Sequence, residues 1–305
     1  MTGIRAFIER HVVVSYFALT FAISWGGALL IIGRTGRIIA RPEEVADLFL
    51  PAYLATVAGP TLASLVLTAT VGGRAGLRDL LARLLAWRVA ARWYAIALVA
   101  APLSVIGTLF ALSLFSPEFL PGFLTGNGQA MPGGLAMPFG LVVGLGLFNG
   151  FVEALGWTGF AIPRMRLRHG VFATGLAVGL LWGAWHFVSN LSLSGGTAGP
   201  LPLVVFMPAL LFSFLPPFRV LMVWVYDQTD SLLIAILMHA SLDIFWLLST
   251  PPGLGAVALV TWYLAWAAVL WAVVAAIALA SRRQFLRHST TAPTGDGSLS
   301  VRHAA

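Results

Sequence analysis

Eight apolar runs, each long enough to cross a lipid bilayer, divide this chain. They cover roughly 12–33, 48–71, 93–116, 136–160, 171–190, 201–225, 231–250 and 257–281. A helix needs ~20 apolar residues to span the hydrocarbon core, where only helices and closed barrels satisfy all their backbone hydrogen bonds. Hydrophobic residues make up 59% of the 305 residues and charged residues 10%, whereas soluble domains have about 25% charged residues. The sequence therefore predicts an all-α integral membrane protein with about eight transmembrane helices.

The arginines predict how these helices are oriented, because short basic loops stay in the cytoplasm. The arginines of one side are Arg5, Arg10, Arg74, Arg78, Arg83, Arg88, Arg92, Arg164, Arg166, Arg168, Arg282, Arg283 and Arg287, together with Arg219 near the end of the sixth run. Arg34, Arg37 and Arg41 fall on the other side, among acidic residues. We therefore expect both termini in the cytoplasm and the protein in a bacterial plasma membrane. The net charge of +7 then reflects topology, not nucleic-acid binding.

Two segments lie outside the predicted spans. Between the second and third runs, the sequence LRDLLARLLAWRVAARWY has leucines at helical spacing and arginines on the other faces; these leucines are Leu77, Leu80, Leu81, Leu84 and Leu85. The pattern predicts a helix in the cytoplasmic interface, and a plain connecting helix fits it equally well. Residues 287–305 are polar and predict a disordered cytoplasmic tail.

Four ionisable side chains lie within the predicted spans: Glu153, His186, His239 and Asp243. A charge at the bilayer centre costs ~2.5–3.5 kcal/mol on insertion scales, so such residues usually face inward and serve a function. Each of them alone also fits a structural hydrogen bond. His239 and Asp243 are four residues apart and share one helix face. The chain has no cysteine, which excludes disulfides and thiolate chemistry.

Small residues predict that the helices carrying these side chains pack closely. Gly144, Gly146 and Gly150 precede Glu153, and Gly175, Gly179 and Gly183 precede His186 at intervals of four. Such spacing lets helix backbones approach each other. Carboxylates and imidazoles are therefore expected to converge from three helices. A set of this kind can polarise a water molecule or bind a metal ion, and both alternatives stay open. The HExxH motif of soluble zinc proteases is absent.

Three short motifs contain these residues: EALGWTG at 153–159, WGAWH at 182–186 and HASLD at 239–243. In their order and spacing they resemble the motifs of the CPBP family of intramembrane proteases, relatives of the type II CAAX prenyl endopeptidase and of bacteriocin-processing and abortive-infection proteins. That family has Glu-Glu-x-x-x-Arg, Phe-x-x-x-His and His-x-x-x-Asn or Asp, each on a separate helix. The resemblance covers about 136–250 and implies a protease-like core within a membrane domain at 1–286.

The resemblance implies that the chain hydrolyses a peptide bond of a membrane-associated protein or peptide. Glu153 would activate the attacking water, helped by His186. His239 and Asp243 match the pair that binds a metal or stabilises the oxyanion. If a divalent metal such as zinc takes part, His186, His239 and Asp243 are its expected ligands. The expected partners are the lipid bilayer and this substrate; the identity of the substrate and the oligomeric state do not follow from the sequence.

Two positions depart from the family pattern, since Ala154 replaces the second glutamate and Thr158 replaces the arginine. Residues four apart on a helix can form an ion pair. Losing only one partner would leave a buried charge unpaired, at a cost of ~3–5 kcal/mol, whereas losing the glutamate and the arginine together leaves none. The rival hypothesis is a catalytically inactive scaffold or immunity protein of the same fold. A proton-coupled transporter is the alternative from another class, although no inverted repeat supports it. Trp157, Trp182 and Trp185 are expected to pack rather than to act in the site.

Overall fold

The computed structural model describes residues 3–35, 46–125, 137–193 and 201–281, and within these ranges all regular structure is helical. Eight helical stretches in the described residues are long and apolar enough to cross a membrane, one for each predicted run. They are Val12–Ile32, Asp47–Leu84, Ala91–Ser113, Phe139–Arg166, Val171–Leu191, Leu203–Thr229, Leu232–Ser249 and Ala256–Ala280. The prediction of an all-α membrane protein is confirmed. The predicted tail at 287–305 lies outside the described residues.

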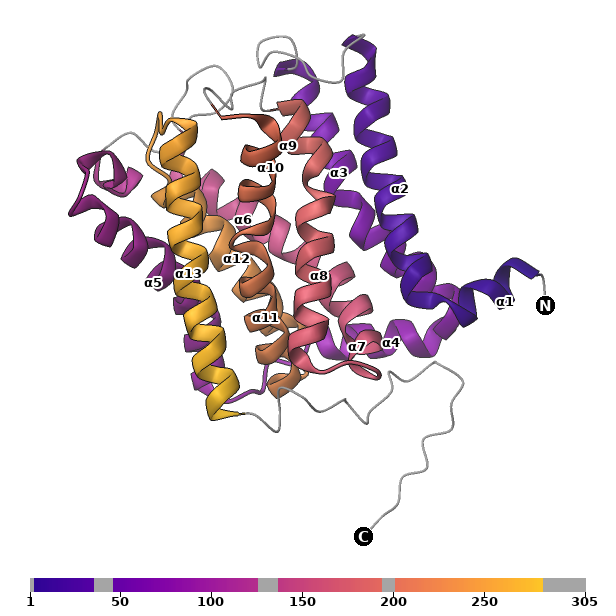
Figure 1. The fold of residues 1–305 in the computed structure, drawn as a ribbon. Helices are drawn as coiled ribbons and strands as arrows, with labels where there is room; N and C mark the ends of the chain where they lie inside the picture. The colour runs from indigo at the N-terminus through magenta and orange to yellow at the C-terminus, as the bar shows by residue number, and fades with distance from the viewer. Residues whose placement is uncertain (1–2, 36–45, 126–136, 194–200, 282–305) are drawn as a thin grey trace.

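The helices form one bundle, which Figure 1 shows from the side. The α-helices are α1 (Gly3–Arg10), α2 (Val12–Ile32), α3 (Ala46–Leu67), α4 (Gly73–Leu84), α5 (Ala91–Ser113), α6 (Phe139–Gly156), α7 (Ile162–Arg166), α8 (Val171–Trp185), α9 (Phe187–Leu193), α10 (Leu203–Phe212), α11 (Leu215–Thr229), α12 (Leu232–Ser249) and α13 (Ala256–Ala280). Short 3-10 turns are η1 (Gly33–Thr35), η4 (Pro117–Phe119) and η5 (Gly122–Leu124), and π-helical turns are η3 (Thr68–Gly72) and η6 (Trp157–Ala161). In Figure 1, α1, α4, α7 and the C-terminal end of α13 lie at the lower end of the bundle.

Prolines and π-turns lie where the regular α-helix of the fourth and sixth spans is interrupted or restarts. Pro163 lies in the first turn of α7 and continues the fourth span beyond η6. Pro216 and Pro217 lie in the first turn of α11, where the missing N–H of proline leaves no helical bond unmade. The sixth span is interrupted between α10 and α11, and these prolines start its second half. The π-turn η6 overlaps the end of the first predicted motif; such turns are frequent at functional sites.

Helix α4 is the helix predicted between the second and third spans, and Figure 1 shows it crossing the lower end of the bundle beside α7. Leu80 is buried against the bundle, whereas Leu77 and Leu81 are exposed. An apolar stripe outside the protein suits a helix at a membrane surface.

Among the arginines of this segment, which were expected on faces other than that of the leucines, Arg83 is buried. Its buried guanidinium bonds Asp79 on its own helix (2.9 Å), the Tyr226 hydroxyl (2.8 Å) and the Gly159 carbonyl (3.0 Å). Arginine carries five N–H donors in a fixed planar arrangement, and these acceptors satisfy several of them at once. Arg83 therefore connects α4 to η6 and to α11.

Glycines set the distances between the helices of the site. A Cβ atom added at Gly150 would lie 2.7 Å from the Ile236 carbonyl oxygen on α12, and one at Gly146 would lie 2.4 Å from Ile244. A Cβ at Gly144 would meet nothing within 4 Å, so the expectation of close packing holds for two of these three glycines. All three glycines of the next group pack closely, with Gly175, Gly179 and Gly183 lying against α11 and the end of α10.

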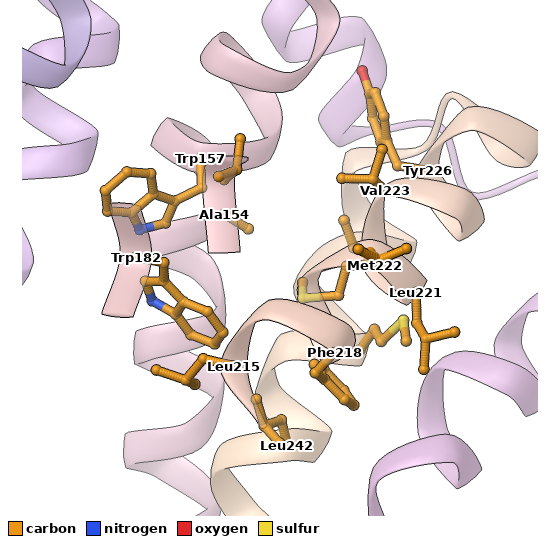
Figure 2. Packing of buried hydrophobic residues seen from close by; sticks show 14 of the residues in the cluster. Ala154, Trp157, Trp182, Leu215, Phe218, Leu221, Met222, Val223, Tyr226 and Leu242 are labelled. Atoms are coloured by element: carbon orange, nitrogen blue, oxygen red, sulfur yellow. The ribbon is translucent and has the colours of Figure 1, made fainter. Parts of the chain in front are cut away.

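The core of the bundle lies between these helices. Figure 2 shows Trp157 from η6 and Trp182 from α8 beside Phe218 and Met222 from α11 and Leu242 from α12. All five side chains are buried. These large rings fix the rotation of each helix about its axis, because a closely packed interior leaves room for few other side-chain positions.

Candidate active site

Glu153 lies in the last turn of α6, four residues before η6 begins at Trp157, and is almost fully buried. Its Oε2 accepts a hydrogen bond of 2.7 Å from the indole Nε1 of Trp182. Trp182 comes from α8, so this bond joins two of the three motifs. Trp182, for which packing was the expected role, therefore both packs in the core and bonds a motif carboxylate. The sequence could not predict this bond, because the indole N–H reaches Glu153 only when α6 and α8 lie side by side.

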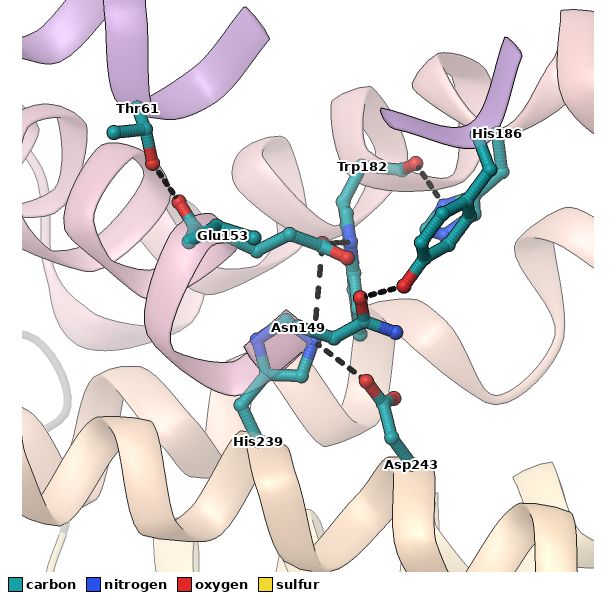
Figure 3. Close-up of polar contacts among 9 residues, drawn as sticks. Thr61, Asn149, Glu153, Trp182, His186, His239 and Asp243 are labelled. Carbon is teal, nitrogen blue, oxygen red and sulfur yellow. Dashed lines mark hydrogen bonds and ion pairs between the residues drawn. The ribbon is translucent and has the colours of Figure 1, made fainter. Parts of the chain in front are cut away.

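His239 faces Glu153 from α12. Its Nε2 is 3.7 Å from Glu153 Oε2 and 3.8 Å from Asp243 Oδ2. Both separations exceed a hydrogen bond, and neither nitrogen of the fully buried ring has a hydrogen-bond partner in the described residues. Figure 3 shows the imidazole between the two carboxylates. The predicted shared face of His239 and Asp243 thus points at Glu153.

His186 forms the end of α8, and the chain continues directly into α9. Its Nδ1 is 2.9 Å from the Trp182 carbonyl oxygen (Figure 3). A carbonyl only accepts, so Nδ1 carries the proton, and the other nitrogen of a neutral ring is then the basic one. The ring packs edge-on against Trp182 and Trp185, at centroid distances of 5.6 and 4.6 Å.

A cavity of about 90 Å³ joins Glu153 and His186. Its wall is completed by α2, α3, α6 and the α8–α9 junction, through Ala28, Ile32, Ala52, Tyr53, Thr56, Val57, Asn149, Trp185 and Ser189. A volume of this size holds a few water molecules, and the polar side chains at its wall are the partners such waters need. Water therefore has room beside a carboxylate that otherwise lies in the core.

Two polar residues of this wall were not predicted. The Tyr53 hydroxyl donates to Asn149 Oδ1, and in the view of Figure 3 the Asn149 side chain lies between the carboxylates of Glu153 and Asp243. Asn149 precedes Glu153 by four residues, on the same face of α6. That spacing was a usable signal, whereas nothing in the sequence around Tyr53 points to this contact.

The two substituted motif positions lie in the core. Ala154 and Thr158 are both fully buried, so neither position contributes a charge to α6 or η6. Arg219 was expected near a span end with the cytoplasmic arginines, and this is wrong. It lies in α11 with no solvent exposure, and its guanidinium carbon is 4.0 Å from the centre of the Trp182 ring.

In the described parts of the chain, no three His, Asp or Glu side chains lie close enough together to hold a metal ion. His186 is held by the Trp182 carbonyl, on the cavity side, and His239 and Asp243 lie next to each other on one face of α12. The donor types suit zinc, but this arrangement does not form the expected three-ligand site.

Residues 134–245 match the family model described as Type II CAAX prenyl endopeptidase Rce1-like. This segment is Rce1-like. The match confirms the resemblance drawn from the three motifs. Glu153, His186, His239 and Asp243 all lie in the Rce1-like segment, whereas Tyr53, which completes the cavity wall, lies outside it. A comparison with curated proteins found no match.

Proposed function

We propose that this protein is an intramembrane endopeptidase in which Glu153 and His186 activate a water molecule against a peptide bond of a membrane-associated substrate. The family match supports a CAAX-type protease at the level of the family. The observation that carries the finer proposal is the cavity, because it places room for water beside the Glu153 carboxylate and the His186 ring inside the bundle. A purely structural carboxylate would need no such space.

The geometry suggests a division of roles. Trp182 holds one oxygen of Glu153, which leaves the other to take a proton from water as a general base. The basic nitrogen of His186 orients the same water. The water oxygen attacks the carbonyl carbon, and the proton held by Glu153 then passes to the departing amine. His239 is the candidate donor to the oxyanion, since its ring nitrogens lack partners among the described residues.

Cleavage by the purified protein in liposomes tests the proposal. The substrates would be a panel of prenylated peptides and leader peptides, each with and without a chelator. We expect wild type to cleave at least one, and both Glu153→Gln and His186→Ala to reduce kcat by roughly 100-fold or more, as loss of a general base does. Glu118→Gln, on the exposed turn η4, is the control and should stay active. Cleavage at wild-type rate by Glu153→Gln would remove this carboxylate from the mechanism.

A catalytically inactive protein of the same fold is the second candidate, favoured by Ala154 and Thr158 at the substituted motif positions. The variants Ala154→Glu, Thr158→Arg and the double variant test it. Activity confined to the double variant would support the inactive natural chain. Wild-type cleavage would exclude it. Chelator sensitivity in the same assay would argue for a metal ion in the reaction.

A further inference from the structure

Arg219 is a buried cation without hydrogen-bond partners. Its exposure is 0%, and none of the three nitrogens of its guanidinium has an acceptor in the described residues. Arginine is almost never fully buried unless it is paired, because removing its charge from water is costly. Something other than a hydrogen bond therefore keeps this charge in α11.

The aromatic ring of Trp182 lies between Arg219 and Glu153. The guanidinium carbon is 4.0 Å from the ring centre, a cation–π contact. The same indole donates its N–H to Glu153 at 2.7 Å, and its ring meets that of His239 edge-on at 5.1 Å. The close approach of α8 and α11 at Gly179, whose added Cβ would lie 3.2 Å from Arg219 Cβ, seats the arginine there.

The charges of the site indicate what Arg219 balances. Glu153 and Asp243 both attract it, and among the described residues around Trp182 it is the side chain with a permanent positive charge. The family pattern places an arginine at the position of Thr158, on the same helix as Glu153. Here that position is neutral and buried, so α6 and η6 offer Glu153 no cation.

We propose that Arg219 supplies from α11 the positive charge that balances Glu153, acting through Trp182, since α6 and η6 carry no cation. Arg219 is a positioning residue, since it touches Trp182 and not the cavity. The inference rests on the proposed function for its effect on catalysis, but the charge balance itself does not require cleavage. Two measurements therefore test the two parts.

The first measurement is cleavage by Arg219→Met, Arg219→Lys and the double variant Arg219→Met, Thr158→Arg. Loss of a preorganised charge typically lowers kcat by about 100-fold. We expect a fall of this size for Arg219→Met with little change in KM, because the substrate does not contact Arg219. Arg219→Lys should recover at least tenfold, and so should Thr158→Arg added to Arg219→Met. Equal kcat in wild type and Arg219→Met would overturn the catalytic part.

The second measurement is a double-mutant cycle of thermal unfolding in detergent, which needs no activity. Arg219→Met should lower Tm in the wild-type background, where it leaves Glu153 unbalanced. In the Glu153→Gln background it should leave Tm unchanged or raise it. Arg83→Met is the matched control, a buried arginine with its own acceptors, and should lower Tm equally in both backgrounds.

The two measurements distinguish failure of the proposed charge balance from failure of the proposed function. Additive effects of Arg219→Met and Glu153→Gln on Tm would overturn the charge balance. Coupling in Tm without cleavage by wild type would contradict the proposed function and leave Arg219 as the partner of Glu153.

Discussion

At the scale of single residues, the bond from Trp182 to Glu153 is the contact that unites the site. The family pattern has phenylalanine at this position, which fills the same space without a donor. In this chain the indole performs two tasks: it holds one carboxylate oxygen and presents its face to Arg219. A hydrogen bond to a charged group contributes ~1.5–3 kcal/mol, so the donor matters more than the packing difference between the two rings.

Trp182→Phe removes the donor and keeps a large ring. We expect kcat to fall roughly 10- to 100-fold, since each 1.36 kcal/mol is a factor of ten in rate. Trp262→Phe is the matched control, because Trp262 is a buried tryptophan of α13 whose N–H has no partner in the described residues; its kcat should stay within threefold of wild type. Steady-state cleavage kinetics of the two variants decide the matter, and equal losses would show that ring size alone is responsible.

At the scale of helices, glycine spacing determines how far Glu153 lies from His239. Gly150→Ala forces α6 away from α12, because the new methyl group would lie 2.7 Å from a carbonyl oxygen. Such overpacking costs ~1–3 kcal/mol, and a shift of about 1 Å at a catalytic group can reduce the rate about 100-fold. We expect both a lower Tm and lower cleavage. Gly144→Ala, which meets open space, should change neither; similar losses in both variants would contradict the argument.

At the end of α11, one substitution is expected to raise the stability of the protein. Asp230 closes the helix in the left-handed conformation, with φ 47° and ψ 24°, and its N–H bonds the Tyr226 carbonyl at 2.8 Å. Residues other than glycine are disfavoured in this conformation, because their Cβ atom crowds the backbone. Asp230→Gly should therefore raise the free energy of unfolding by about 1 kcal/mol, measured as a higher Tm. A lower Tm would mean that the Asp230 side chain contributes more than its backbone conformation costs.

At the scale of the whole molecule, the arginine-rich segments gather at one end of the bundle, where α4 and α7 lie (Figure 1). This agrees with the expected cytoplasmic face but does not by itself assign it. The absence of cysteine makes a labelling test simple. In intact cells, a membrane-impermeant maleimide should label Gly255→Cys, in the loop before α13, and should not label His169→Cys, between α7 and α8. The reverse pattern would invert the proposed topology.

The predictions that succeeded rest on local information. Hydropathy runs predict spans because every transmembrane helix must be apolar over the same length. The spacing of His239 and Asp243 predicts their shared face because helix geometry is fixed. Neither depends on how two helices meet.

The contacts that the sequence did not predict concern relations between helices. Trp182, Arg83 and Arg219 each have a partner or neighbour more than 25 residues away, and α4, α8 and α11 reach these only through their rotation in the bundle. Arginine counting assigned Arg83 to the segment between two spans and Arg219 to a span end, because the positive-inside rule weighs charges near span ends without asking which face they occupy. Both are buried in this protein.

If the protein is a protease, the size of the cavity limits which substrates it can admit. At about 90 Å³ it is well below the roughly 300–1,000 Å³ of pockets that enclose a ligand. Water fits beside Glu153, but a stretch of polypeptide does not. If the protein cleaves peptides, α2 and α3 must first move apart from α6 and α9, a motion typically of microseconds to milliseconds. Membrane proteins that do not induce this opening would then not be cleaved. Substrates would be selected when they enter the cavity, before the peptide bond is attacked.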